Sequence, residues 1–159
     1  MMNGIVLYVE DEEFDVFFMQ RAFERAGLKG SLQVVITGKD AIAYLRGDGA
    51  YADRERHPLP TIILLDLNLP LISGFQVLEW LRNESQFQHL PVIVFSSSAR
   101  PEDKTRANKL GAKDYIQKPR SGLEFSAIVQ TLKERWLDRE PGNLPSQQAE
   151  SFRLSPRPN

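Results

Sequence analysis

The stretch Thr61-Ile62-Ile63-Leu64-Leu65-Asp66-Leu67-Asn68-Leu69-Pro70 decides the fold of this chain. Its first five residues are apolar or β-branched without interruption, which is typical of a strand buried on both faces of a parallel sheet. An acid, Asp66, follows directly, and Pro70 marks a turn. A buried strand that ends in a carboxylate predicts an α/β domain with its chemistry at the carboxyl end of the sheet.

Four other short segments have the same strand-like character. They are Ile5 to Val9, Leu32 to Ile36, Val92 to Phe95 and Asp114 to Gln117. Between them, apolar residues recur every three or four positions, as at Phe14, Phe18 and Ala22, which is typical of helices. Five strands in strict alternation with helices predict a doubly wound α/β domain built on a five-stranded parallel sheet.

Glycines and serines mark the expected ends of the helices. Gly27, Gly47 and Gly111 follow three of the helical patterns, where a glycine accommodates the left-handed backbone of a helix end. Ser73 and Ser121 precede two others, where a serine oxygen can cap free backbone N–H groups. These residues indicate where the helices begin and end.

Two segments depart from the alternation. The connection from Gly47 to Pro60 is long and polar, and we interpret it as a surface loop. The segment from Asp138 to Asn159 holds four of the ten prolines and few apolar residues, which predicts a flexible tail. We therefore expect one folded domain over residues 3 to 137, with a tail over 138 to 159.

The composition excludes several classes of function. Lysine and arginine number 20 against 21 acids, so no strong basic field attracts nucleic acid or an anionic membrane. The absence of cysteine excludes disulfides, thiolate metal sites and a cysteine nucleophile. No apolar run approaches the roughly 20 residues that span a bilayer. We expect a cytoplasmic protein whose partners are proteins.

Polar groups follow the expected strands at their carboxyl ends. They are Glu10 and Asp11 after the first strand, Asp66 and Asn68 after the third, Ser96 after the fourth and Lys118 after the fifth. Because the carboxyl ends of parallel strands meet at one edge of the sheet, these groups are predicted to lie together.

Such an acidic cluster suits Mg²⁺, which binds a few carboxylate oxygens and keeps some water. Asp11 and Asp66 are predicted as direct ligands, with the backbone carbonyl of Asn68 as a third and Glu10 acting directly or through water. Lys118 would place a positive charge beside Asp66. This arrangement favours phosphoryl transfer, in which the Asp66 carboxylate attacks phosphorus and forms an acyl phosphate.

Other polar residues near this cluster have simpler interpretations. Ser97 or Ser98 is expected to cap the following helix, which leaves Ser96 to face the acids and donate a hydrogen bond. His57 and His89 stand alone in the sequence and are assigned to surface loops, without a metal or a phosphorelay role.

The chain resembles the receiver domain of two-component response regulators, the CheY-like family, over about residues 3 to 137. The matching motifs are Leu7-Tyr8-Val9-Glu10-Asp11, Leu64 to Pro70 with Ser73-Gly74, Pro91 to Ser97, and Gly111 to Pro119. The loop with Tyr51-Ala52-Asp53 and the pair Trp136-Leu137 are similar to the single-domain regulators of bacterial and cyanobacterial phytochromes. The resemblance implies a flavodoxin-like sheet with the strand order 2-1-3-4-5.

The resemblance also implies roles for individual residues. They are Asp66 as phosphoacceptor, Glu10 and Asp11 as the metal-binding acids, Lys118 as the phosphate-contacting lysine, Ser96 as the switch hydroxyl and Tyr115 as the switch aromatic. The implied partner is a sensor histidine kinase, and the similarity to phytochrome regulators implies a phytochrome-like one. The implied chemistry is limited to the chain's own phosphorylation and dephosphorylation, so no enzyme acting on other substrates is expected.

Two helical patterns carry more apolar residues than one core stripe requires. The first helix offers Phe14, Phe17 and Phe18, which predicts a contact surface for the kinase. The last helix has a stripe from Phe125 to Trp136, which predicts a homodimer through the fourth helix, fifth strand and fifth helix. The fourth helix, about Pro101 to Leu110, has few apolar residues and is predicted to move.

Other functions remain as alternatives. A phosphatase of the haloacid-dehalogenase type also uses an aspartate at a strand end, but it needs a second acid where this chain has Asn68. Glycine-rich nucleotide-binding motifs of the Rossmann and P-loop types do not follow the first strand. A phosphate sink, or a docking module independent of phosphorylation, is a further alternative.

Overall fold

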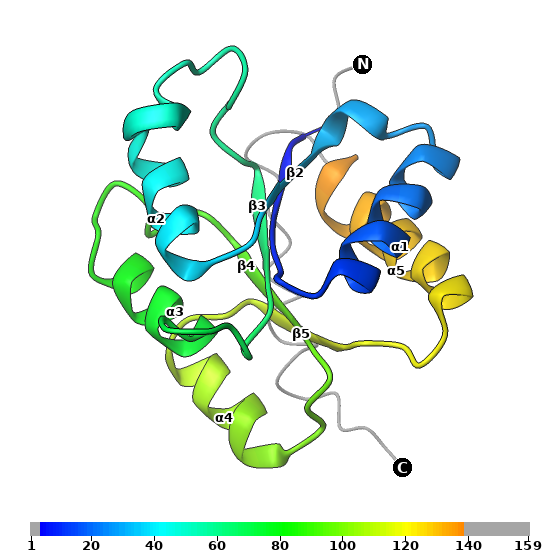
Figure 1. Ribbon diagram of the computed structural model, residues 1–159. Coiled ribbons are helices and arrows are strands. Elements are labelled where there is room, and N and C mark those ends of the chain that lie inside the picture. Colours follow the sequence, from blue (N-terminus) through cyan, green and yellow to red (C-terminus); the bar gives the residue numbers. More distant parts are fainter. Residues whose placement is uncertain (1–3, 139–159) are drawn as a thin grey trace.

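Residues 4–138, which the computed structural model describes, fold around one parallel β-sheet (Figure 1). Its strands lie in the order β2-β1-β3-β4-β5, as predicted. They are β1 (Val6–Val9), β2 (Leu32–Val35), β3 (Ile62–Leu65), β4 (Val92–Ser96) and β5 (Asp114–Gln117). The α/β fold class is therefore confirmed.

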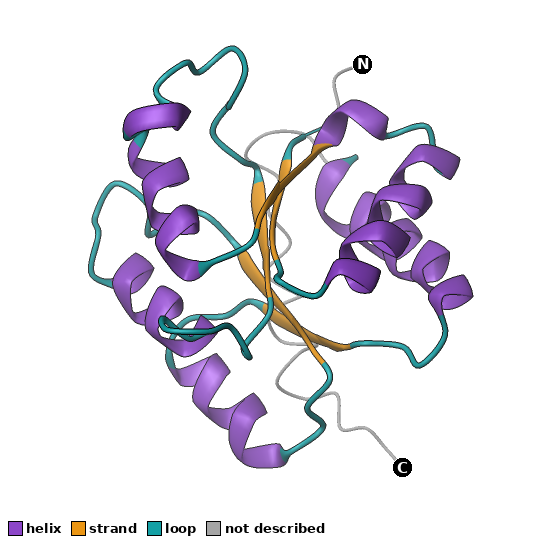
Figure 2. Cartoon of the chain, in the orientation of Figure 1, coloured by secondary structure: helices purple, strands orange, loops and turns teal. Residues whose placement is uncertain are grey.

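Helices cover both faces of this sheet (Figure 2). One face carries α1 (Glu13–Arg25) and α5 (Phe125–Leu132), and the other carries α2 (Gly38–Arg46), α3 (Gly74–Arg82) and α4 (Pro101–Lys109). Shorter helical turns are η1 (Lys29–Ser31), η2 (Gly49–Tyr51), η3 (Gly122–Glu124) and the π-helical η4 (Lys133–Leu137). The molecule thus has three layers.

Each face of the sheet has its own hydrophobic core, because side chains alternate along a strand. Leu7 and Val9 belong to the core under α2, α3 and α4, whereas Val6 and Tyr8 belong to the core under α1 and α5. All four residues are fully buried. Burial on both faces explains why β1 and β3 are uninterrupted apolar runs in the sequence.

The glycines and serines that were predicted to mark helix ends lie at or next to the ends of helices. Gly47 is the C-cap of α2 with φ 74°, and Gly27 and Gly111 lie one residue beyond a C-cap with φ 76° and 103°. Ser73 forms a capping box with Gln76 at the start of α3. Ser121 caps η3, the turn that leads into α5.

The connection from Gly47 to Pro60 is more ordered than the expected polar surface loop. The guanidinium of Arg54 donates hydrogen bonds to the carbonyls of Tyr44, Leu45 and His57 at 2.8–3.0 Å. The Tyr44 hydroxyl donates to the Pro58 carbonyl at 2.8 Å. Since a helix leaves its last carbonyls unpaired, Arg54 satisfies the end of α2 and fixes the loop against it.

The apolar stripe of the last helix is almost entirely used by the core. Phe125, Val129 and Leu132 are at most 2% exposed, and Trp136 is 8% exposed. The helix ends at Leu132 and continues as η4, whose wider turn buries Trp136 and Leu137. The prediction that this helix has surplus apolar surface for a homodimer was therefore wrong. The predicted tail from 139 onward lies outside the described residues.

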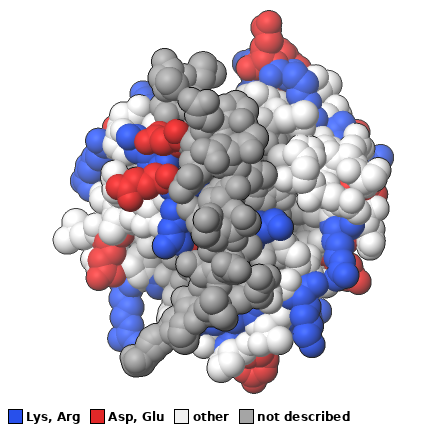
Figure 3. Space-filling view, turned by 180° about the vertical axis from the view of Figure 1, so that it is seen from behind, with Lys and Arg blue, Asp and Glu red and all other residues white. Residues whose placement is uncertain are grey.

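Charged side chains on the visible surface are mixed in sign. Figure 3 views the molecule from behind, and on the part of that face that is coloured, blue and red side chains alternate with white ones. This matches the near balance of 20 basic and 21 acidic residues. Among residues 4–138, no helix has the length and apolar character needed to cross a membrane.

Candidate functional site

Three acids meet at the carboxyl end of the sheet, as the sequence predicted. Asp66 follows β3 directly, and Glu10 and Asp11 follow β1. One carboxylate oxygen from each lies within 4.8 Å of the others. Val9 pairs with Leu65 in the register of β1 and β3, so the two strands end side by side and deliver their acids to one place.

Glu10 is completely buried, and its carboxylate has three polar partners. Its carboxylate accepts hydrogen bonds from the Tyr8 hydroxyl at 3.1 Å and the Glu12 backbone N–H at 3.2 Å. Lys118 lies 2.8 Å from the same carboxylate. Burial raises the pKa of Glu10 to about 7, with Asp66 adding to the rise and the Lys118 hydrogen bond opposing it.

Lys118 follows β5 and reaches into the acidic cluster. Its ammonium group lies 2.8 Å from Glu10, 2.8 Å from Asp15 and 3.4 Å from Asp66. Burial alone lowers the pKa of Lys118, but the hydrogen bonds to Asp15 and Glu10 and the charge of Asp66 outweigh it and raise the pKa. Lys118 is therefore a fixed positive charge beside Asp66.

The turn after Asp66 keeps this carboxylate in place. The backbone N–H of Asn68 donates to Asp66 Oδ1 at 3.3 Å, so the Asn68 backbone lies beside the cluster. Gly74, the first residue of α3, approaches the same turn so closely that a Cβ atom would collide with the backbone of Asp66 and Leu67. Glycine is therefore required where α3 begins.

Ser96 and Tyr115 are linked through the loop that follows β4. Ser96 is fully buried, and its hydroxyl accepts from the Ser98 N–H at 3.1 Å. The Tyr115 hydroxyl donates to the Ser98 carbonyl at 2.8 Å. Tyr115 therefore bonds to the loop ahead of α4, although a strand-edge tyrosine would by default place its hydroxyl in water.

The expected serine cap of α4 was wrong. The N-cap residue is Arg100, which makes no side-chain cap, and Pro101 is the first helical residue. Ser98 lies two residues earlier, where its hydroxyl accepts from the Arg100 N–H at 3.2 Å and donates to Asp103 at 2.6 Å. Ser98 thus ties the loop to the first turn of α4 from outside the helix.

Residues 6–130 match the response regulator receiver domain family. The chain belongs to this family. The expected fold and family are thus confirmed, and receiver domains serve in general as signalling modules of two-component systems.

Three known proteins illustrate the similarity of this receiver. FilR2 of Methanothrix harundinacea, a probable methanogenesis regulatory protein, is 35% identical over 87% of this chain and 88% of its own length. The phosphorylated cyanobacterial phytochrome response regulator RcpA is 31% identical, with a TM-score of 0.77 over 85% of this chain and 94% of that one. The Mn²⁺-bound form of response regulator Rcp1 is 30% identical, with a TM-score of 0.72 over 89% and 99%. The expected similarity to phytochrome regulators is confirmed.

Asp15 was not among the predicted site residues. This acid lies on α1, and its carboxylate lies 2.8 Å from the Lys118 ammonium group. Asp11 precedes α1, so the helical spacing of four residues does not relate it to Asp15, and the sequence offers no local signal for this acid.

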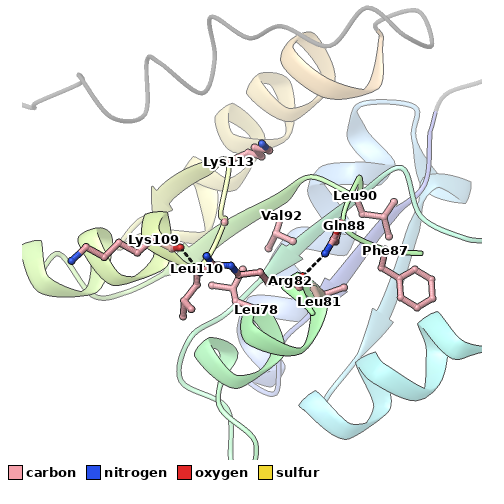
Figure 4. A pocket seen from close by; sticks show the side chains of 11 residues that line it. Leu78, Leu81, Arg82, Phe87, Gln88, Leu90, Val92, Lys109, Leu110 and Lys113 are labelled. Carbon is pink, nitrogen blue, oxygen red and sulfur yellow. Dashed lines mark hydrogen bonds between the residues drawn. The ribbon is translucent and has the colours of Figure 1, made fainter. Parts of the chain in front are cut away.

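A hollow of about 320 Å³ lies away from the acids, between the ends of α3 and α4 (Figure 4). Leu78, Leu81, Phe87 and Val92 are among its lining residues. Arg82 extends across it and donates to the Lys109 carbonyl at 2.9 Å. None of the predicted site residues lines this hollow, and Val92 is at the end of β4 remote from Ser96. The hollow is therefore separate from the acidic cluster.

Proposed function

We propose that this receiver is a Mg²⁺-dependent phosphoacceptor that takes a phosphoryl group from a sensor histidine kinase on Asp66. The observation that carries the proposal is the position of Asp66. It is 3% exposed, shares a site with Glu10 and Asp11, and lies 3.4 Å from the Lys118 ammonium group. A carboxylate in this setting suits phosphoryl transfer, which depends on positioning and on charge neutralisation.

Asp66, Lys118 and Ser96 have different roles in this transfer. A carboxylate oxygen of Asp66 forms the new bond to phosphorus while the bond from phosphorus to the donor's imidazole nitrogen breaks, and its electron pair stays on that nitrogen. Lys118 places positive charge where the phosphoryl oxygens arrive. Ser96 supplies a hydroxyl that can donate to one of those oxygens.

The donor set of the site fits Mg²⁺. Asp11 and Asp66 would hold the ion with the Asn68 carbonyl, and Glu10 would act directly or through water. Asp11 is exposed, so it is accessible to a hydrated ion, whereas Glu10 already pairs with Lys118. The bound ion would supply the positive charge that offsets three acids and an incoming phosphate. The Mn²⁺-bound form of Rcp1 supports a divalent ion in such a site.

A phosphatase acting on other molecules fits the site less well. That function needs an acid two residues after the nucleophile to act as general acid and base, and Asn68 cannot exchange a proton in that way. We propose that the chain promotes only its own phosphorylation and dephosphorylation. As a signalling partner of a kinase it would act in the cytoplasm.

The kinase is proposed to dock on α1. Phe14 is 73% exposed and Phe17 is 48% exposed, while Phe18 packs against Phe125 with 5.8 Å between ring centroids. Exposed aromatic side chains beside an active site favour a protein contact. Since RcpA is a phytochrome response regulator, a phytochrome-like kinase is the partner that this similarity supports.

The output of the switch is proposed to pass through Tyr115 and α4. Ala107 is the buried residue of α4, so this helix has little apolar anchoring. A phosphoryl group on Asp66 would draw the Ser96 hydroxyl toward it and weaken the arrangement of Ser96, Ser98 and Tyr115. The changed surface of α4, β5 and α5 would then alter partner binding or homodimer formation.

The central experiment measures the mass of the protein after incubation with acetyl phosphate and Mg²⁺. Wild type should gain a single phosphoryl group, whereas Asp66→Asn should gain none. Chelating the metal with EDTA should abolish the gain, because the acids then repel the incoming anion. A wild-type protein that stays unmodified would refute the proposal. Normal labelling with no change in assembly or partner binding would identify a phosphate sink.

A further inference from the structure

We propose that Asp15 is a positioning residue that holds Lys118 in the resting receiver and competes with the phosphoryl group for it. Asp15 lies on α1, outside the groups that the sequence predicted for the site. Its Oδ2 atom lies 2.8 Å from Lys118 Nζ, closer than the 3.4 Å that separates Nζ from Asp66. The inference rests on the proposed function of Asp66 as phosphoacceptor.

The ammonium group of Lys118 has a partner for each of its donors. A lysine ammonium carries three N–H groups. Three carboxylates surround it, those of Glu10, Asp15 and Asp66. The contact with Asp66 is the longest of the three at 3.4 Å, so Lys118 has to move toward a phosphoryl oxygen on Asp66 and away from another partner.

Asp15 is the partner that is released most easily. The Glu10 side chain is 0% exposed, so loss of Lys118 would leave a buried charge without its counterion, which is costly. The Asp15 side chain is 24% exposed, and water can solvate its carboxylate once the lysine leaves. Asp66 itself carries the phosphoryl group and keeps Lys118 nearby.

Asp15 therefore opposes phosphorylation in two ways. Its carboxylate has to give up Lys118, and its negative charge adds to the repulsion of an incoming phosphate. Replacement by asparagine keeps the size of the side chain and removes the charge. The Asp15→Asn variant should consequently gain its phosphoryl group from acetyl phosphate roughly two- to fivefold faster, the range expected for one partly exposed ion pair.

The first test compares labelling rates of four proteins by mass spectrometry with Mg²⁺ and acetyl phosphate. Asp15→Asn should label faster than wild type, and Asp15→Glu, which keeps the carboxylate, should return toward the wild-type rate. Glu13→Gln is the matched control, because Glu13 is an exposed acid of the same helical turn and has no contact with Lys118 within the described chain. Its rate should not change.

The second test is a crystal structure of wild type with Mg²⁺ and beryllofluoride, a mimic of the phosphoryl group. Lys118 should contact the mimic and lie beyond hydrogen-bonding distance of Asp15. The inference is overturned if Lys118 keeps its contact with Asp15 in that structure. It is also overturned if Asp15→Asn labels no faster than wild type, or if Glu13→Gln labels as fast as Asp15→Asn. If wild type is not labelled at all, the proposed function itself fails, which is a different result.

Discussion

The helices α4 and α5 flank the same edge of the sheet but are anchored very differently. α5 buries Phe125, Val129 and Leu132 in the core that it shares with α1, and η4 adds Trp136 and Leu137. α4 buries Ala107, a side chain with a single methyl group. Because burial of apolar area is the main stabilising contribution, we expect α5 to belong to the stable scaffold and α4 to open more easily.

The largest expected effect is on the α5 side. Phe125→Ala removes a ring that is 2% exposed and that packs edge-to-face on Phe95 with 5.6 Å between centroids. It should lower the free energy of unfolding by about 3–5 kcal/mol. Leu110→Ala, at the half-buried end of α4, should cost only about 1 kcal/mol. Urea denaturation followed by circular dichroism measures both, and equal losses would contradict the comparison.

Hydrogen exchange measures the difference in local stability between α4 and α5 without a mutation. Backbone amides of α4 should exchange at least about tenfold faster than those of α5, because little apolar surface is exposed when α4 opens. Exchange monitored by mass spectrometry or NMR resolves the two helices. Protection in α4 equal to that in α5 would remove the physical basis for movement of α4.

A smaller effect is expected from the hydrogen bond between β5 and the loop ahead of α4. Tyr115→Phe keeps the ring but removes the hydroxyl that donates to the Ser98 carbonyl. Stability should fall by about 0.5–1.5 kcal/mol. Exchange in residues 97–109 should rise while α5 is unchanged, and an effect spread evenly over both helices would show that Tyr115 does not act on α4 specifically.

The smallest effect is predicted for the ion pair at the start of α4. Arg100 and Glu102 lie 3.3 Å apart, but their side chains are 68% and 66% exposed. Water screens such a pair, so Glu102→Gln should leave stability and phosphorylation unchanged. A measurable loss in urea denaturation would mean that α4 depends on its surface charges more than its burial indicates.

Site residues that follow strand ends could be predicted from the sequence. A site residue that is defined by a contact with a distant side chain could not. The acids after β1 and β3 could be placed together because parallel strands bring their carboxyl ends to one edge. Asp15 was missed because its importance comes from Lys118, 103 residues away in the chain. No local pattern records such a contact.

The error on the last helix has a different cause. Apolar periodicity shows how much surface a helix could bury but not how much its neighbours require. Phe125 meets both Phe95 of β4 and Phe18 of α1, so its ring is fully used inside the domain. The expected exposed aromatic surface on α1 is confirmed for Phe14 and Phe17, whereas Phe18 packs against Phe125 inside the domain.

The hydrogen bonds of Arg54 also bear on how the folded chain is digested by proteases. Trypsin cuts after arginine, and it requires the side chain in its specificity pocket with the neighbouring backbone extended. Arg54 is engaged by three carbonyls, whereas Arg56, two residues later, is exposed. Within the connection from Gly47 to Pro60, limited trypsinolysis should therefore begin after Arg56, and cleavage after Arg54 should wait until the end of α2 releases its guanidinium.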